Sequence, residues 1–166
     1  RDGCELPYLG RPLRVHILCA DAHNTHLAQD GALHVCVPPA GHLRDAVQAW
    51  MMTQARAHFR ERLDHFAPLL GVQWHTLALS SAATRWGSAG RTRDGQAVIR
   101  LNWRLMHHRP QVIDYVVVHE LSHLRVMNHS PRFWETVASV MPDYAQHRRA
   151  LRDEPLPPWV LSLIHI

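Results

Sequence analysis

The pattern His-Glu-x-x-His at His119, Glu120 and His123 constrains the fold of this chain more than any other feature of its sequence. Residues four apart on a helix lie one above the other, so the two imidazoles would point to the same side. Two imidazoles at this spacing suit a zinc ion, and a glutamate beside the first can accept a proton from a water held by that ion. The pattern therefore predicts a helix over this segment with a metal site on one face.

His129 follows His123 by six residues and is the third ligand that we expect for a catalytic zinc, which keeps its fourth position open. The alternative is an exposed helical face with ordinary polar histidines. The apolar run Val116–Val118 indicates a buried helix instead, and buried His and Glu need partners. We therefore interpret His119, His123 and His129 as zinc ligands and Glu120 as the catalytic base.

Composition restricts the class of protein. A chain of 166 residues with 46% hydrophobic residues is typical of one folded domain. No apolar stretch approaches the roughly 18 residues of a membrane span, and no signal peptide is evident, so no membrane association is predicted. The three cysteines, Cys4, Cys19 and Cys36, lack Cys-x-x-Cys spacing and form no disulfide framework, which favours a cytoplasmic location.

The net charge is +4, and all basic residues apart from histidine are arginines. A nucleic-acid-binding surface would require them to cluster, but they are scattered through the sequence. Only Arg91/Arg93 and Arg148/Arg149/Arg152 form groups. Association with DNA is therefore a secondary hypothesis, and the sequence leaves the oligomeric state open.

Hydrophobic periodicity predicts the remaining elements in chain order: strands over 13–19 and 32–37, a helix over 42–70, strands over 75–79 and 97–102, and helices over 130–141 and 143–152. Gly87 and Gly90 are interpreted as turn residues between the later strands. We predict an α+β fold, in which a mainly antiparallel N-terminal sheet and a long helix precede the helix of the motif and the C-terminal helices. Residues 1–154 are expected to form a single domain and 155–166 an extended tail. Residues 161–166 resemble a translated sequencing adapter.

Four segments together resemble the YgjP-like metallopeptidase family, which is related to the SprT-like proteins and other small zincins: Arg85–Ser88, Ile99–Leu105, Val112–Leu124 and Asn128–Trp134. The resemblance implies a minimal zincin domain and a zinc-dependent hydrolase that acts on peptides or proteins. It also implies that His119, His123 and His129 bind Zn²⁺ and that Glu120 is the base. In the family a cysteine commonly follows Arg-Trp-Gly-Ser, whereas this chain has Ala89 there.

The exit from the helix distinguishes this chain from the metzincins. Metzincins share its histidine spacing but have a glycine where this chain has Val126, and valine adopts a positive φ only with strain. We therefore predict that the helix runs from Pro110 to Asn128. Asparagine tolerates the left-handed conformation that would turn His129 back to the metal.

Two other functions remain open at this stage. The first is a metal-dependent nucleotide (UTP) pyrophosphatase, for which Arg125 and Arg132 are the nearby basic residues. The second is a non-catalytic module in which zinc stabilises a nucleic-acid-binding surface, and a fourth protein ligand would favour it.

For a peptidase, Arg85–Ser88 or Ala97–Leu101 could provide the edge strand that holds an extended substrate. Arg85 and Asn102 are the candidates for stabilising the oxyanion, although a structural role is the favoured interpretation of each.

Overall fold

The computed structural model describes residues 3–19, 24–37 and 43–153. Its elements in chain order are β1 (Glu5–Tyr8), β2 (Arg11–Cys19), β3 (Asn24–Leu27), β4 (Leu33–Val37), α1 (Leu43–Leu70), β5 (Thr76–Ser80), β6 (Gly87–Arg91), β7 (Ala97–Asn102), the 3-10 helix η1 (Trp103–His107), α2 (Pro110–Ser122), α3 (Pro131–Val140) and α4 (Tyr144–Asp153). The α+β class is therefore confirmed. The proposed tail over 155–166 lies outside the described residues.

The N-terminal sheet has the strand order β1-β2-β4-β3 and is mainly antiparallel, as predicted. Its one parallel pair joins β2 to β4, because β3 lies between them in sequence and pairs with β4 from the other side. The two short outer strands, β1 and β3, were not predicted. Backbone bonds attach this sheet to the rest of the molecule, with Leu9 N donating to Met106 O at 2.7 Å.

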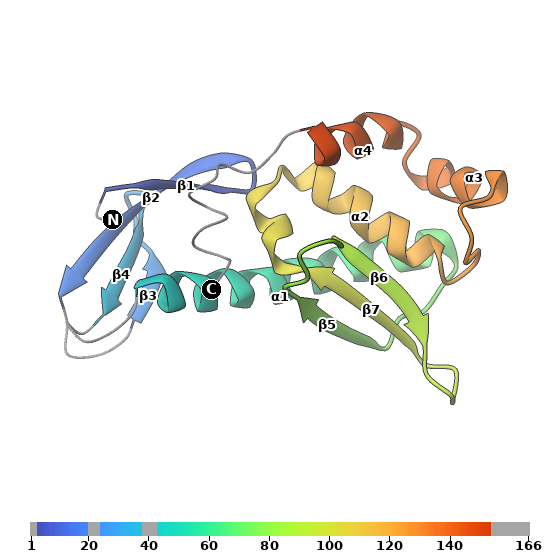
Figure 1. Cartoon of the computed structure of the whole chain (residues 1–166), viewed down its shortest axis with the longest axis horizontal. Coiled ribbons are helices and arrows are strands. Elements are labelled where there is room, and N and C mark those ends of the chain that lie inside the picture. The colour runs from blue at the N-terminus through green and yellow to red at the C-terminus, as the bar shows by residue number, and fades with distance from the viewer. Residues whose placement is uncertain (1–2, 20–23, 38–42, 154–166) are drawn as a thin grey trace.

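Helix α1 is 28 residues long and runs from the N-terminal sheet to the second sheet and α2 (Figure 1). One stripe of its surface is buried, including Phe59 and Leu63, which are both 0% exposed. Gly71 has a φ of +68° and follows the last residue of the helix, Leu70, where the predicted helix also ends. Beside this stripe, the Arg62 guanidinium donates to both carboxylate oxygens of Asp114 at 2.8 and 3.1 Å, which joins α1 to α2.

The second sheet has the strand order β5-β7-β6, so β7 is central and β6 lies at an edge. The interpretation of Gly87 and Gly90 as turn residues was wrong, because both lie in β6 and pair with β7. Ala97–Leu101, as part of the central strand, is not available as an edge. Figure 1 shows β6 running beside α2, which carries the motif.

Helix α2 ends at Ser122, so the prediction that it continues to Asn128 was wrong. The amides of residues 123–125 bond back three residues, to the carbonyls of residues 120–122, and tighten the last turn. Of the described non-glycine residues, only Leu9 has a positive φ, so Asn128 is not left-handed. The chain leaves the helix through this tight turn. Within the described residues, no helix is long and apolar enough to cross a membrane.

Candidate metal centre

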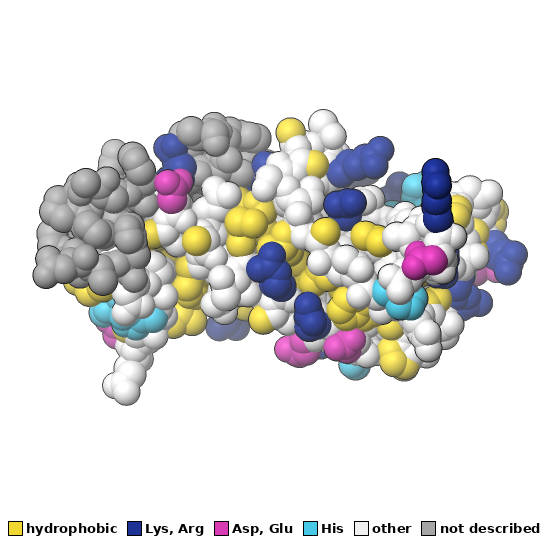
Figure 2. All heavy atoms as spheres, turned by 90° about the horizontal axis from the view of Figure 1, so that it is seen from below, with side chains coloured by type: hydrophobic (Ala, Val, Ile, Leu, Met, Phe, Trp, Pro, Cys, Tyr) yellow, Lys and Arg dark blue, Asp and Glu magenta, His cyan; other side chains and the backbone are white. Residues whose placement is uncertain are grey.

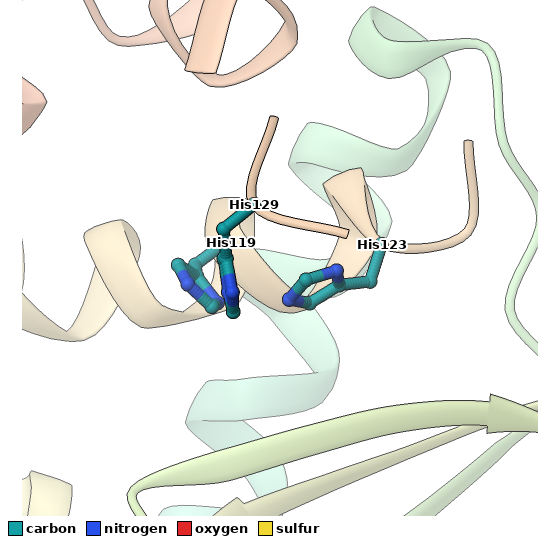
Figure 3. A group of neighbouring side chains, drawn as sticks. All are labelled: His119, His123 and His129. Atoms are coloured by element: carbon teal, nitrogen blue, oxygen red, sulfur yellow. The ribbon is translucent and has the colours of Figure 1, made fainter. Parts of the chain in front are cut away.

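The three predicted ligands come together although they lie on different parts of the chain. His119 is on α2, His123 caps its C-terminus, and His129 lies in the loop before α3. One ring nitrogen from each lies within 4.8 Å of the others, and the three rings point toward one another (Figure 3). His123 is 9% exposed, whereas His129 is exposed, so the group is closed on one side and open on the other.

Hydrogen bonds to two of the rings determine which nitrogen is free. The Nδ1 of His123 lies 3.1 Å from the Val126 carbonyl oxygen, which can only accept, so this Nδ1 carries the proton. The Nδ1 of His119 lies 3.0 Å from Oε2 of Glu120 and donates to that carboxylate in the same way. In the neutral form of each ring, Nε2 is therefore the nitrogen that carries the lone pair. This is the arrangement usual for histidine ligands, in which the other ring nitrogen donates to a carboxylate or a carbonyl.

The start of α3 holds His129 in place. Ser130 is its N-cap and accepts from the Phe133 amide at 3.4 Å, and Pro131 occupies the first turn. The Phe133 ring is 0% exposed and contacts all three histidines, with centroid distances of 5.1, 4.4 and 5.0 Å to His119, His123 and His129. The Trp134 ring stacks on His129 at 5.9 Å.

The protonation of His129 suits a metal ligand. Desolvation lowers its pKa below the usual value, and the neighbouring His119 and His123 lower it further. The ring is therefore neutral at neutral pH and presents a lone pair. Three imidazole nitrogens form a donor set that fits a borderline transition-metal ion such as zinc.

Glu120 is 5% exposed and lies between the metal group and β6. If residue 87 carried a Cβ atom, that atom would lie 3.0 Å from Cγ and 3.2 Å from Oε2 of Glu120. It would also lie 3.1 Å from the Arg100 carbonyl oxygen. Glycine at position 87 thus avoids a close approach to Glu120 and the Arg100 carbonyl, and its φ is not the reason for it. Sequence reasoning missed this contact because it placed Gly87 in a turn.

The metal group lines a cavity of about 700 Å³ between β6, α2 and α4. Two lining residues that sequence reasoning missed are Tyr115 and Arg148. Tyr115 precedes His119 by four residues and so shares its helical face, a signal that was present in the spacing. Burial raises the pKa of Tyr115 to about 12, so its hydroxyl keeps its proton.

Of the other residues considered from the sequence, one lines the cavity and three do not. Arg85 lines the cavity. Asn102 has a structural role, because its side-chain amide donates to the carbonyls of Ala82 and Arg85 and its Oδ1 accepts from the Arg104 amide. Arg125 and Arg132 do not line the cavity, and Arg125 instead donates to the Leu70 carbonyl at 3.4 Å.

The fold and the group of ligands define an α+β domain with a His-Glu-x-x-His helix and a third histidine just beyond it. The chain belongs to the YgjP-like family: the family described as "YgjP-like, metallopeptidase domain" matches residues 1–154.

Two solved structures are similar, both metallopeptidase zymogens. Pyrococcus abyssi abylysin is 21% identical, with a TM-score of 0.49 over 59% of this chain and 97% of its own. Methanocaldococcus jannaschii jannalysin is 13% identical, also with a TM-score of 0.49, over 58% of this chain and 95% of its own. No curated protein matches the chain significantly.

Replacing His129 by alanine should weaken zinc binding by about 100-fold or more, because it removes one of three ligands. The side chain is exposed, so the variant should still fold. Affinity can be measured by competition with a chromophoric chelator. His65→Ala, which removes an exposed histidine of α1, is the matched control. Equal zinc affinities for the two variants would show that His129 is not a ligand.

Proposed function

We propose that this protein is a zinc-dependent metallopeptidase in which His119, His123 and His129 hold the ion and Glu120 is the general base. The observation that carries the proposal is the buried Glu120 carboxylate beside a three-histidine group that opens onto a cavity. Within the described residues the metal-binding group contains no fourth ligand. A catalytic zinc has three protein ligands and an open position, whereas structural sites are usually closed by four.

The chemistry follows from these groups. Zinc, when bound, lowers the pKa of a water toward neutrality and polarises a carbonyl. Glu120 would accept the proton of the attacking water and transfer it to the leaving amine nitrogen. Its burial between His119 and Gly87 holds the carboxylate in one place, which favours proton transfer along a fixed path.

Strand β6 is the expected docking edge for an extended peptide. It is an edge strand, and Gly87, Ser88 and Ala89 line the cavity beside the metal group. The unpaired backbone groups of an edge can bond to a substrate strand, and the pockets beside it select side chains. Of the two edges considered from the sequence, only the one that includes Gly87 and Ser88 is compatible with the sheet order.

Tyr115 is the proposed donor to the carbonyl oxygen of the substrate as negative charge develops there. Its ring centroid lies 5.8 Å from that of His119, and the residue lines the cavity. Because its pKa is raised to about 12, the hydroxyl is a hydrogen-bond donor throughout the neutral range. Tyr115 takes the place of Asn102 as the candidate for this role, because the Asn102 side chain already forms hydrogen bonds with backbone groups.

The same site geometry bears on the two alternative functions, a nucleotide pyrophosphatase and a non-catalytic DNA-binding module. A nucleotide pyrophosphatase needs basic groups near the metal, and Arg85, Arg148 and Arg152 line the cavity. Nucleotides therefore belong in the substrate panel. On the face drawn in Figure 2, arginine side chains are spread out with apolar surface between them. This face therefore does not show the clustered basic surface that a non-catalytic DNA-binding module would use.

Glu120→Gln should lower kcat by at least about 100-fold while zinc remains bound, because general-base catalysis is lost but no ligand is removed. Hydrolysis of casein, of synthetic peptides and of UTP should be measured side by side, together with zinc content. Wild-type hydrolysis of UTP alone would favour the pyrophosphatase. If zinc is stoichiometric and the variant remains as active as wild type, the assignment of Glu120 is wrong.

Tyr115→Phe should lower kcat by about 10- to 100-fold with little change in KM, because a donor to the developing charge is lost. Steady-state kinetics on one peptide measures both constants. Tyr144→Phe is the control, since Tyr144 stacks on Trp134 at 5.1 Å and does not line the cavity. Similar kcat values for the two variants would exclude the proposed role of Tyr115.

Gly87→Ala should lower kcat by about 10- to 100-fold, because the new methyl group displaces the Glu120 carboxylate. Gly90→Ala on the same strand meets nothing within 4 Å and serves as the control. Zinc affinity and Tm should be recorded for both, to separate displacement of the base from unfolding. Equal activities of the two variants would contradict a positioning role for Gly87.

A further inference from the structure

The cavity beside the metal group is rich in positive charge. Three arginines line it, Arg85, Arg148 and Arg152, against a single carboxylate, that of Glu120. Arg152 is neutralised by Asp153, to which its Nε donates at 2.9 Å. In the part of the chain that the structure describes, neither Arg85 nor Arg148 has a carboxylate partner. The bound zinc of the proposed function would add further positive charge.

Arg148 is held over the site by an aromatic stack. Its guanidinium carbon lies 4.8 Å from the centre of the Trp134 ring, which is typical of a cation–π contact. Trp134 stacks in turn on the proposed ligand His129. The charge of Arg148 also acts on a group in the cavity. Burial raises the pKa of Tyr115, and the positive charge of Arg148 partly opposes that rise.

Arg85 approaches from the other side of the cavity, in the segment just before β6. Its backbone is fixed, because its carbonyl oxygen accepts from the Asn102 side chain at 3.1 Å. The two free guanidinium groups therefore come from anchored positions on different elements. A planar guanidinium binds a carboxylate through two parallel hydrogen bonds, which suits it to recognise an acidic group.

We propose that Arg85 and Arg148 bind a carboxylate of the substrate close to the cleaved bond, so that the enzyme selects acidic peptides. This inference rests on the proposed peptidase function and names its substrate class. A basic peptide would be repelled by the same groups, since the cavity offers only Glu120 as a counter-charge. A cavity of about 700 Å³ accommodates a few residues on either side of the bond.

A peptide that the enzyme cleaves should be resynthesised with Glu, Gln or Lys at each residue flanking the cleaved bond. We expect kcat/KM to fall from Glu to Gln to Lys by roughly five- to tenfold per step, between the effect of an exposed ion pair and that of a charged hydrogen bond. The preference should shrink in high salt, which screens charges that are open to solvent.

Charge reversal at Arg148 gives the sharpest comparison. Arg148→Glu should invert the preference, so that the Lys peptide becomes the better substrate. Arg149→Glu introduces the same charge on the next, exposed residue of α4, which does not line the cavity, and should leave the preference unchanged. Equal cleavage of the three peptides by wild type, or equal effects of the two reversals, would overturn the inference while the peptidase function stands.

Binding supplies a readout that does not depend on turnover. The affinities of zinc-loaded Glu120→Gln for the Glu and Lys peptides should be compared by calorimetry, with and without the Arg148→Glu change. Tighter binding of the Glu peptide that is lost with Arg148 supports the proposal. If no peptide is cleaved, the proposed function fails, and the same binding comparison with a synthetic peptide pair that differs only in Glu or Lys at one position still decides whether the cavity binds a carboxylate. If UTP alone is bound and hydrolysed, the anion is a phosphate and both proposals are wrong.

Discussion

The packing of Phe133 among three histidines is the interaction on which the rest of the site depends. His119 and His123 share a helical face because of their spacing, but His129 belongs to a loop with no helical register of its own. A fully buried ring in contact with all three removes much of the freedom of that loop. Ser130 and Pro131 start α3 at the same point, so the helix cap, the core contact and the candidate ligand lie within five residues. A loop stabilised in this way can present an exposed side chain in a fixed position.

The other wall of the site depends on the absence of a side chain. Helix α2 and strand β6 approach so closely at Gly87 that even one methyl group would contact Glu120 and the Arg100 carbonyl. This proximity gives the carboxylate its burial and places it beside the edge strand that lines the cavity. The proposed base, two of the three candidate metal ligands and the proposed substrate edge are thus parts of one contact between a helix and a sheet. This is consistent with catalysis by a small domain.

The sequence predicts the elements whose signals are local, and it predicts less well those that depend on contacts with other parts of the chain. The long helix, the helix of the motif and α3 were predicted because their apolar periodicity and caps are local properties. Strand β6 was predicted only in part, through Arg85–Ser88 as a possible edge strand, because Gly87–Gly90 has no apolar alternation and is a strand through its pairing with β7. The prediction that α2 ends at Asn128 was wrong for a related reason. The Asn128 cap is a local argument, whereas the Val126 carbonyl is taken by the ring of His123, a side-chain contact that propensity does not include.

For the charged residues too, proximity to the motif in the sequence did not predict proximity to the cavity in the structure. Arg125 and Arg132 are the basic residues nearest to the motif in sequence, and neither lines the cavity. Arg148 is more distant along the chain, yet α4 packs against α2 and Trp134 holds its guanidinium beside the site. Trp134 therefore supports both a candidate metal ligand, through its stack on His129, and a candidate substrate contact, through Arg148. Since both rest on one indole ring, a shift of α3 would move the candidate metal site and the charge proposed to select the substrate together. The proposed catalytic site and the proposed substrate specificity thus depend on the same packing contact.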